Sequence, residues 1–271
     1  MNSTLTLSTK CSTNGKTLLD EYFATPPFKV MTVPAYQDAW QNGLNAMQMS
    51  SSPGLLGGDK LDIRLTLAKN TSLSLGTQAF TRVQAMNEGE FAEQQTQIEL
   101  AEGSRLFYLP HPLVLHRDAA FKQATEVQLE ANCVLIYGEI VAIGRVANNE
   151  RFAFRAFSSH LNVQLLQNDG KIRPLVRDCI QWHPANMPLT ALSQMEDFSH
   201  QGSLIYLNLT QNAQEIKQCV QRLQTQLAED KTVLAGVSQL HEGGLIVRVL
   251  GHRADTIERL FKQIGEQLKA N

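Results

Sequence analysis

Between residues 16 and 182, apolar residues recur at every second position, and turn-forming residues interrupt this alternation at short intervals. Residues 61–67 alternate strictly, and residues 161–165 do so before an Asn-Asp-Gly turn at 168–170. Such a turn is a strong hairpin signal, because glycine tolerates the positive φ that tight turns need. A period of two places every second side chain on one face, so the pattern predicts half-buried strands and not βαβ units.

We therefore expect a β-rich fold with an all-β body over residues 16–185. Its sheets are predicted to be mostly antiparallel and arranged as a sandwich or a solenoid-like stack. After Pro188 the spacing changes, and residues 203–271 predict a small C-terminal β-α-β-β-α portion that carries two helices. Residues 184–193, with a loop-like composition, are the best candidate junction between the two parts, and we expect them to form a single domain over residues 1–271.

The last helix is predicted from one apolar stripe, formed by Ile257, Leu260, Phe261, Ile264 and Leu268. Asp255 and Glu258 have the spacing of a capping box at its start. The stripe has to be covered, either by the strands at 232–250 or by a partner protein.

Charge and hydropathy exclude several classes of protein. A net charge of −2 and the absence of any Lys/Arg block argue against nucleic-acid binding. The longest purely apolar stretch, residues 133–137, is too short to span a bilayer. Residues 1–14 are rich in Ser and Thr and lack the basic start and apolar core of a signal peptide. We expect a cytoplasmic protein that binds neither nucleic acid nor a membrane.

Catalytic motifs are missing as well. The chain carries no nucleophile elbow, no phosphate-binding loop, no His-Glu-x-x-His helix and no dinucleotide fingerprint. His111 and His116 are a poor metal pair, because Pro110 and Pro112 exclude a shared helix and an odd spacing on a strand points side chains to opposite faces. We expect no catalytic residue, no tightly bound metal and no cofactor of its own.

Two carboxylates have unusual settings. Asp59 follows Gly57 and Gly58 immediately before a strand, where it either caps its own loop or holds a charge on rigid backbone. Glu139 interrupts an apolar segment, and a charge there must be paired, exposed or beside a wet cavity. Arg145 is the nearest candidate partner along the chain.

At these places the sequence resembles the UreD family of urease accessory proteins, which is also called UreH. The matching segments, in order, are 53–59, 77–79, 109–112, 118–119 and 144–145, and together with flanking similarity they cover roughly residues 18–268. Residues 54–56 depart from the two adjacent glycines of many relatives. The individual positions that the resemblance marks are Gly57, Gly58, Asp59, Thr77, Gln78, Pro110, Pro112, Asp118, Gly144 and Arg145.

The resemblance implies a non-catalytic scaffold, or metallochaperone, that acts in urease maturation. It implies complexes with UreF, with the GTPase UreG and with apo-urease, either singly or as a dimer of complexes. Nickel would then be cargo in transit to the dinickel centre of urease, and members of the family are implicated in an internal tunnel for it. The missing phosphate-binding loop agrees with UreG supplying nucleotide hydrolysis.

A conduit must bind its ion weakly enough to release it, so isolated carboxylates suit it better than His or Cys clusters. The candidates for a transient nickel path are therefore Asp59, Asp62 and Glu139. Two other functions stay open on the sequence. One is a β-sandwich module that binds a small ligand, and the other is a metal-dependent hydrolase in which Asp59, Asp118, Glu139 and His116 converge.

Overall fold

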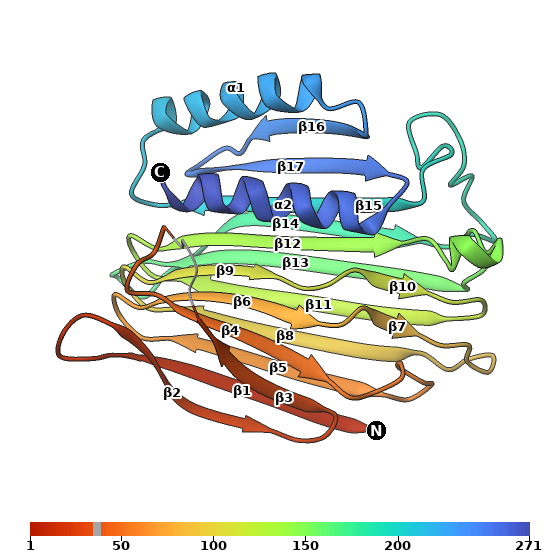
Figure 1. The fold of residues 1–271 in the computed structure, drawn as a ribbon, viewed down its shortest axis with the longest axis horizontal. Coiled ribbons are helices and arrows are strands. Elements are labelled where there is room, and N and C mark those ends of the chain that lie inside the picture. The colour runs from red at the N-terminus through yellow and green to blue at the C-terminus, as the bar shows by residue number, and fades with distance from the viewer. Residues whose placement is uncertain (35–38) are drawn as a thin grey trace.

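The computed structural model describes residues 1–34 and 39–271, and its strands form two facing β-sheets, here called sheet A and sheet B (Figure 1). Sheet A has the order β14 (Ile172–Trp182), β13 (Ala156–Leu166), β11 (Ala120–Leu129), β8 (Ala92–Leu100), β5 (Lys60–Leu67), β1 (Asn2–Cys11), β2 (Thr17–Ala24). Sheet B has the order β16 (Val233–Gln239), β17 (Gly244–Gly251), β15 (His200–Asn208), β12 (Val134–Ala142), β9 (Arg105–Leu109), β6 (Ser72–Gln78), β4 (Leu44–Ser50), β3 (Phe28–Val33). Two short strands, β7 (Thr81–Val83) and β10 (Leu113–Leu115), lie beside sheet B, and a short 3-10 helix, η1, spans Val146–Asn148.

The body is a solenoid-like coil, because the chain crosses from sheet A to sheet B after each of β5, β8 and β11. The corners are Asn70, Gly103 and Asn132, which all have φ near +60° to +70°. Successive corners also bond to each other, since Asn70 N–H donates to Glu102 O and Gly103 N–H donates to Ala131 O. The turn signals in the sequence therefore mark corners between two sheets.

This coil corrects one expectation. Mostly antiparallel pairing was expected, but β5, β8, β11 and β13 pair in parallel, as do β4, β6, β9 and β12. A strand that returns to the same sheet after one full coil runs in the same direction as its predecessor, so the sheets are mixed. The hairpin at 168–170 is confirmed, because β13 and β14 pair antiparallel.

The body also begins earlier than residue 16. Strand β1 starts at Asn2 and pairs in parallel with β5, while β2 pairs with β1 at the edge of sheet A. Polar Ser and Thr alternate with buried Leu5 and Leu7 in β1, so the Ser- and Thr-rich start of the chain is a strand of the body.

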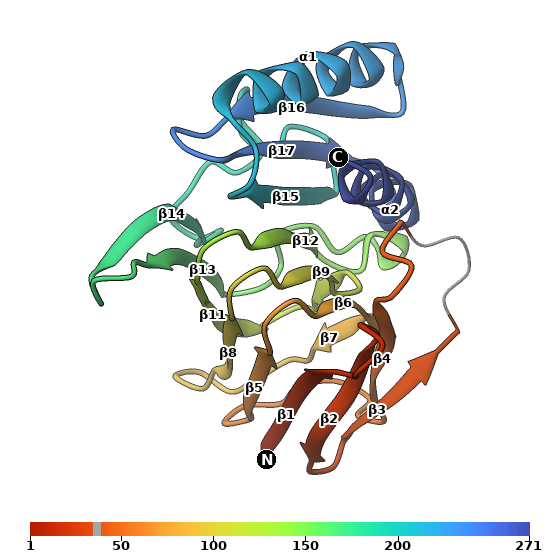
Figure 2. The same cartoon turned by 90° about the vertical axis from the view of Figure 1, so that its left-hand side faces the viewer.

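The C-terminal portion has the expected order β15, α1 (Ala213–Glu229), β16, β17 and α2 (Ala254–Lys269). It is continuous with the body, because β15 pairs with β12 inside sheet B. Figure 2 shows the two sheets face to face, with α1 and α2 at the opposite end of the stack from the N-terminus. Within the described residues, neither helix is long and apolar enough to cross a membrane.

Helix capping differs from the expectation. The capping box of α2 is not formed: its N-cap is Arg253, which makes no capping side-chain bond, and Asp255 pairs with Arg253 instead. A complete capping box occurs at α1, where Asn212 and Glu215 satisfy each other's backbone N–H groups. The reason is local geometry, because the box requires the Ser, Thr, Asp or Asn to stand at the N-cap itself.

The apolar stripe of α2 is covered by the protein's own sheet. Ile257, Phe261 and Ile264 are fully buried, and α2 packs on β12, β15, β17 and β9. Close approach depends on glycine, since a Cβ at Gly202 would lie 2.8 Å from Phe261 Cζ. Of the two alternatives left by the sequence, the structure supports docking on the sheet, although the strands involved are mainly β12, β15 and β17.

Candidate functional site

A run of polar cavities lies between the two sheets. The first has a volume of about 140 Å³ and is lined from Phe28 to Gln94, and the second, of about 50 Å³, reaches Glu139. The two share Gln48, Thr77 and Thr81 in their walls. Because sandwich interiors are normally filled by apolar side chains, this arrangement of buried amides and hydroxyls indicates a wet path along the axis of the stack.

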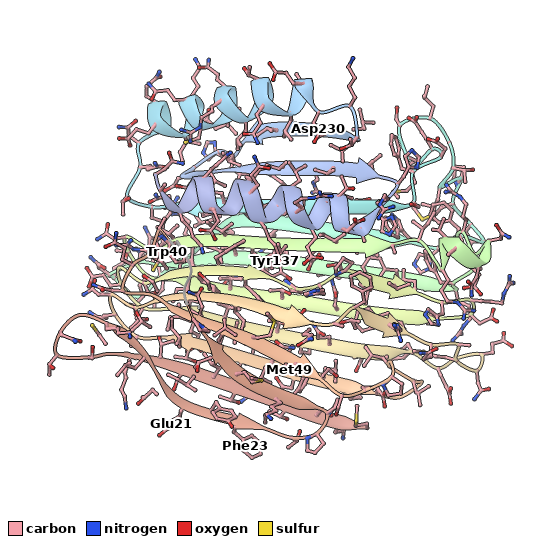
Figure 3. All side chains as sticks on the ribbon, viewed as in Figure 1. Glu21, Phe23, Trp40, Met49, Tyr137 and Asp230 are labelled. Atoms are coloured by element: carbon pink, nitrogen blue, oxygen red, sulfur yellow. The ribbon has the colours of Figure 1, made fainter. Side chains whose placement is uncertain are left out.

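The path narrows beyond Glu139. A third cavity of about 10 Å³, room for one water molecule, shares Tyr137 and Glu139 with the second. Figure 3 shows Tyr137 near the middle of the stack. Asp178 on β14 and Ser203 on β15 also line this third cavity.

Glu139 is the one carboxylate shared by the second and third cavities. It interrupts the inward-facing row of β12, where its neighbours Tyr137 and Val141 both belong to the core between the sheets. Neutral groups hold it: Tyr137 OH donates to Oε1 at 2.7 Å, Gln123 Nε2 to Oε1 at 3.1 Å and Ser159 Oγ to Oε2 at 2.9 Å. Burial raises the pKa of Glu139, and these bonds act against that rise.

Arg145, the partner suggested by the sequence, does not reach Glu139. Its Nε donates to Glu150 Oε2 at 2.8 Å, and its Nη2 also binds the other carboxylate oxygen of Glu150. Gly144 has φ +153°, and a Cβ there would collide with the backbone carbonyl of Glu150. The Gly-Arg motif thus builds a surface turn closed by an ion pair.

This turn makes stability depend on pH. The Arg145 guanidinium lowers the pKa of Glu150 from 4.5 to about 2. Since the folded-state pKa is depressed, the stabilisation is present above pH 4.5 and is lost as the pH falls towards 2. We expect Glu150→Gln to lower the melting temperature at pH 7, with a difference from wild type that shrinks below pH 4.5. Arg145→Gln should lower the melting temperature in the same way. If either variant melts at the same temperature as wild type at pH 7, the ion pair does not stabilise the fold.

Asp59 is a loop cap. Its Oδ1 lies 2.6 Å from the Met1 ammonium, and its Oδ2 accepts the Leu56 N–H at 2.8 Å. Gly58 in the same turn has φ +79°, and Gly57 packs against the Glu90 carboxylate. Both carboxylate oxygens of Asp59 are therefore engaged at the entry of β5, and Asp59 is not among the residues that line the three cavities.

Asp62 lies on the outer face of β5, where its half-exposed carboxylate pairs with Arg64 at 3.2 Å. Among the three acidic residues chosen from the sequence, the structure therefore brings only Glu139 to the cavities. Asp178 was missed, because an acidic residue on an alternating strand such as β14 looks like an ordinary surface position.

Several other marked positions border the path. Thr77 lines the first two cavities, and its Oγ1 accepts the His111 N–H at 2.7 Å. Gln78 lines the first cavity, Pro110 lines the second, and Pro112 is buried. Asp118 lies away from them, in an exposed turn with φ +60° whose N–H donates to Ala153 O.

The hydrolase alternative gains no support from this arrangement. Within residues 1–34 and 39–271, no three His, Cys, Asp or Glu side chains come together as a group able to hold a metal ion. Asp59 is bound to Met1, Asp118 is exposed and Glu139 is held by neutral donors. The path between the sheets narrows to the size of one water and gives a β-sandwich ligand module no room, whereas hollows of about 360 and 440 Å³ lie elsewhere on the protein.

Comparison with known proteins matches the whole chain, residues 1–271, to the family model described as UreD urease accessory protein. A protein of Haemophilus influenzae (strain PittGG) named urease accessory protein UreD is 69% identical over 270 residues and is covered completely, as is this chain. A protein of the same name from Actinobacillus pleuropneumoniae serotype 5b (strain L20) is 67% identical over 270 residues, which cover 100% of this chain and 98% of the relative.

Proposed function

The chain belongs to the UreD family of urease accessory proteins, and from this premise we propose that it is a non-catalytic scaffold that passes nickel towards apo-urease along the path between its sheets. The observation that carries the proposal is Glu139, a partly buried carboxylate held by neutral donors and shared by consecutive cavities between the sheets. A desolvated carboxylate whose hydrogen bonds come from neutral groups is costly, so its presence in the middle of the path supports a role with a cation.

The chemistry of the walls supports transit over storage. Ni²⁺ binds nitrogen and sulfur ligands tightly, and a cluster of them would trap the ion. The path instead offers the amides of Gln48 and Gln94, hydroxyls such as Thr77, the carboxylates of Glu139 and Asp178, and a single imidazole at His111. Isolated oxygen ligands give weak binding at several points, which lets an ion both enter and leave.

The remaining steps need partners. We infer from the family that UreF, the GTPase UreG and apo-urease assemble with this protein, singly or as a dimer of complexes, in the cytoplasm. The sequence carries no phosphate-binding loop, so nucleotide hydrolysis falls to the GTPase. The scaffold would hold the donor and acceptor of nickel at the two ends of the path.

Deletion of the gene tests the proposal most directly. We expect urease to accumulate as protein but to lack nickel and activity, and a plasmid copy of the gene should restore both. The measurement is nickel per urease active site by mass spectrometry, next to urease protein by immunoblot. Urease that carries its normal nickel content in the deletion strain would overturn the proposed function.

A further inference from the structure

The narrow end of the path is closed by an ion pair that joins the two sheets. Arg248 on β17 of sheet B reaches across to Asp178 on β14 of sheet A, with 2.5 Å between Nη2 and Oδ1. Its Nη1 also donates to Ser203 Oγ at 2.8 Å. Asp178 and Ser203 both line the third cavity, and Ser203 is the cross-strand neighbour of Glu139. The guanidinium is therefore fastened to the wall of the cavity at its constriction.

This ion pair stands at the boundary with solvent. The side chain of Arg248 is 41% exposed and that of Asp178 is 21% exposed, whereas Glu139, which lines the same cavity, lies on β12 among the residues between the sheets. An ion that moves between the third cavity and the solvent on this side must pass the Asp178 carboxylate. While Arg248 occupies that carboxylate, the ion meets a fixed positive charge.

We propose that Arg248 is the gate of the path: its guanidinium, held on Asp178 and Ser203, closes the solvent mouth, and a divalent cation passes only when Arg248 leaves Asp178. This inference rests on the proposed function, because it assumes that a cation uses the path. With Arg248 displaced, the mouth presents the carboxylates of Asp178 and Glu139 and the hydroxyls of Ser159 and Ser203. Hard divalent cations and hydrated Ni²⁺ accept oxygen ligands of this kind.

Electrostatics makes arginine suitable for this position. A guanidinium carries several donors in a rigid plane, so Arg248 bonds to Asp178 and Ser203 at the same time. An ion pair that is half exposed contributes little net stability, because water solvates both partners when they separate. The closed state therefore repels a divalent cation and still opens at small cost.

Nickel binding to the full-length protein tests the gate. In equilibrium dialysis with NiCl₂, Arg248→Gln should bind the ion about tenfold more tightly than wild type, because the carboxylate of Asp178 is freed and a positive charge is removed. Arg248→Lys keeps the charge and should stay within about twofold of wild type. The matched control is Arg173→Gln, since Arg173 forms a similarly exposed ion pair with Glu242 away from the cavities. Equal affinity of Arg248→Gln and wild type would overturn the gate.

A second variant covers the case in which Arg248→Gln fails to fold. Asp178→Asn breaks the ion pair and also removes the carboxylate that would bind the ion, while the positive charge of Arg248 stays nearby. Nickel should therefore bind to this variant more weakly than to wild type. Binding at or above the wild-type affinity in Asp178→Asn would contradict the gate independently.

The gate and the proposed function fail in different ways. If Arg248→Gln leaves nickel affinity unchanged while Glu139→Gln still blocks urease activation, the gate is wrong and the conduit stands. If Arg248→Gln binds nickel more tightly but Glu139→Gln activates urease normally, the mouth binds a cation that the activation does not use. Tighter binding in Arg248→Gln that is lost again in the double variant with Glu139→Gln is the result expected from both proposals together.

Discussion

Removal of residues 254–271 is expected to unfold the protein and not merely to detach a partner-binding helix. Helix α2 covers the outer face of β12, β15, β17 and β9, and Ile257, Phe261, Ile264 and Leu268 are buried against them. Burying one such side chain is worth about 1.5–3 kcal/mol. Loss of the whole set is comparable with the total stability of a domain, which is about 5–15 kcal/mol.

Circular dichroism and size-exclusion chromatography of the truncated protein would measure this effect, and we expect loss of the cooperative melt and aggregation. Single substitutions in α2 should reduce the stability by smaller amounts and leave the chain at full length. Phe261→Ala should cost about 3–5 kcal/mol, because it leaves a cavity beside Gly138 and Gly202. Gln263→Ala, on the exposed face of the same helix, is the control and should change stability little. A truncated protein that melts like wild type would show that sheet B does not need α2.

Substitution of Glu139 by Gln is expected to lower the nickel content and activity of urease by at least about tenfold, a change that corresponds to about 1.4 kcal/mol. Glutamine has the shape of glutamate, so its oxygen can keep accepting from Tyr137 and Gln123 while its amide faces Ser159. The fold should survive, and the loss then reports the missing charge in the path.

Urease activity and nickel per active site in cells that express the variant are the measurements, with thermal melting of the purified protein as the check on folding. Glu126→Gln is a matched control, because Glu126 also accepts from an amide, that of Asn162, but lies on the exposed face of β11. Normal activation of urease by Glu139→Gln would remove this residue from the path, and a fall in melting temperature alone would assign it a structural role.

Sequence patterns were sufficient for features that depend on neighbours along the chain. The alternation within each strand, the hairpin between β13 and β14 and the order of the C-terminal elements all follow from local periodicity. The special position of Glu139 also followed, because a charge inside an apolar run needs a buried polar partner wherever the strand lies.

Tertiary structure decided which segments meet. A strand pattern is the same in a hairpin and in a coil, so only the stacking of successive coils made β5, β8 and β11 parallel neighbours. The tertiary structure also determines which charged groups pair. Asp59 pairs with the Met1 ammonium, 58 positions away in the sequence, and Arg248 pairs with Asp178, 70 positions away. Such pairs form because the coil brings distant strands to one level, and the free energy that stacks those strands comes from the apolar core between the sheets, which no local pattern records.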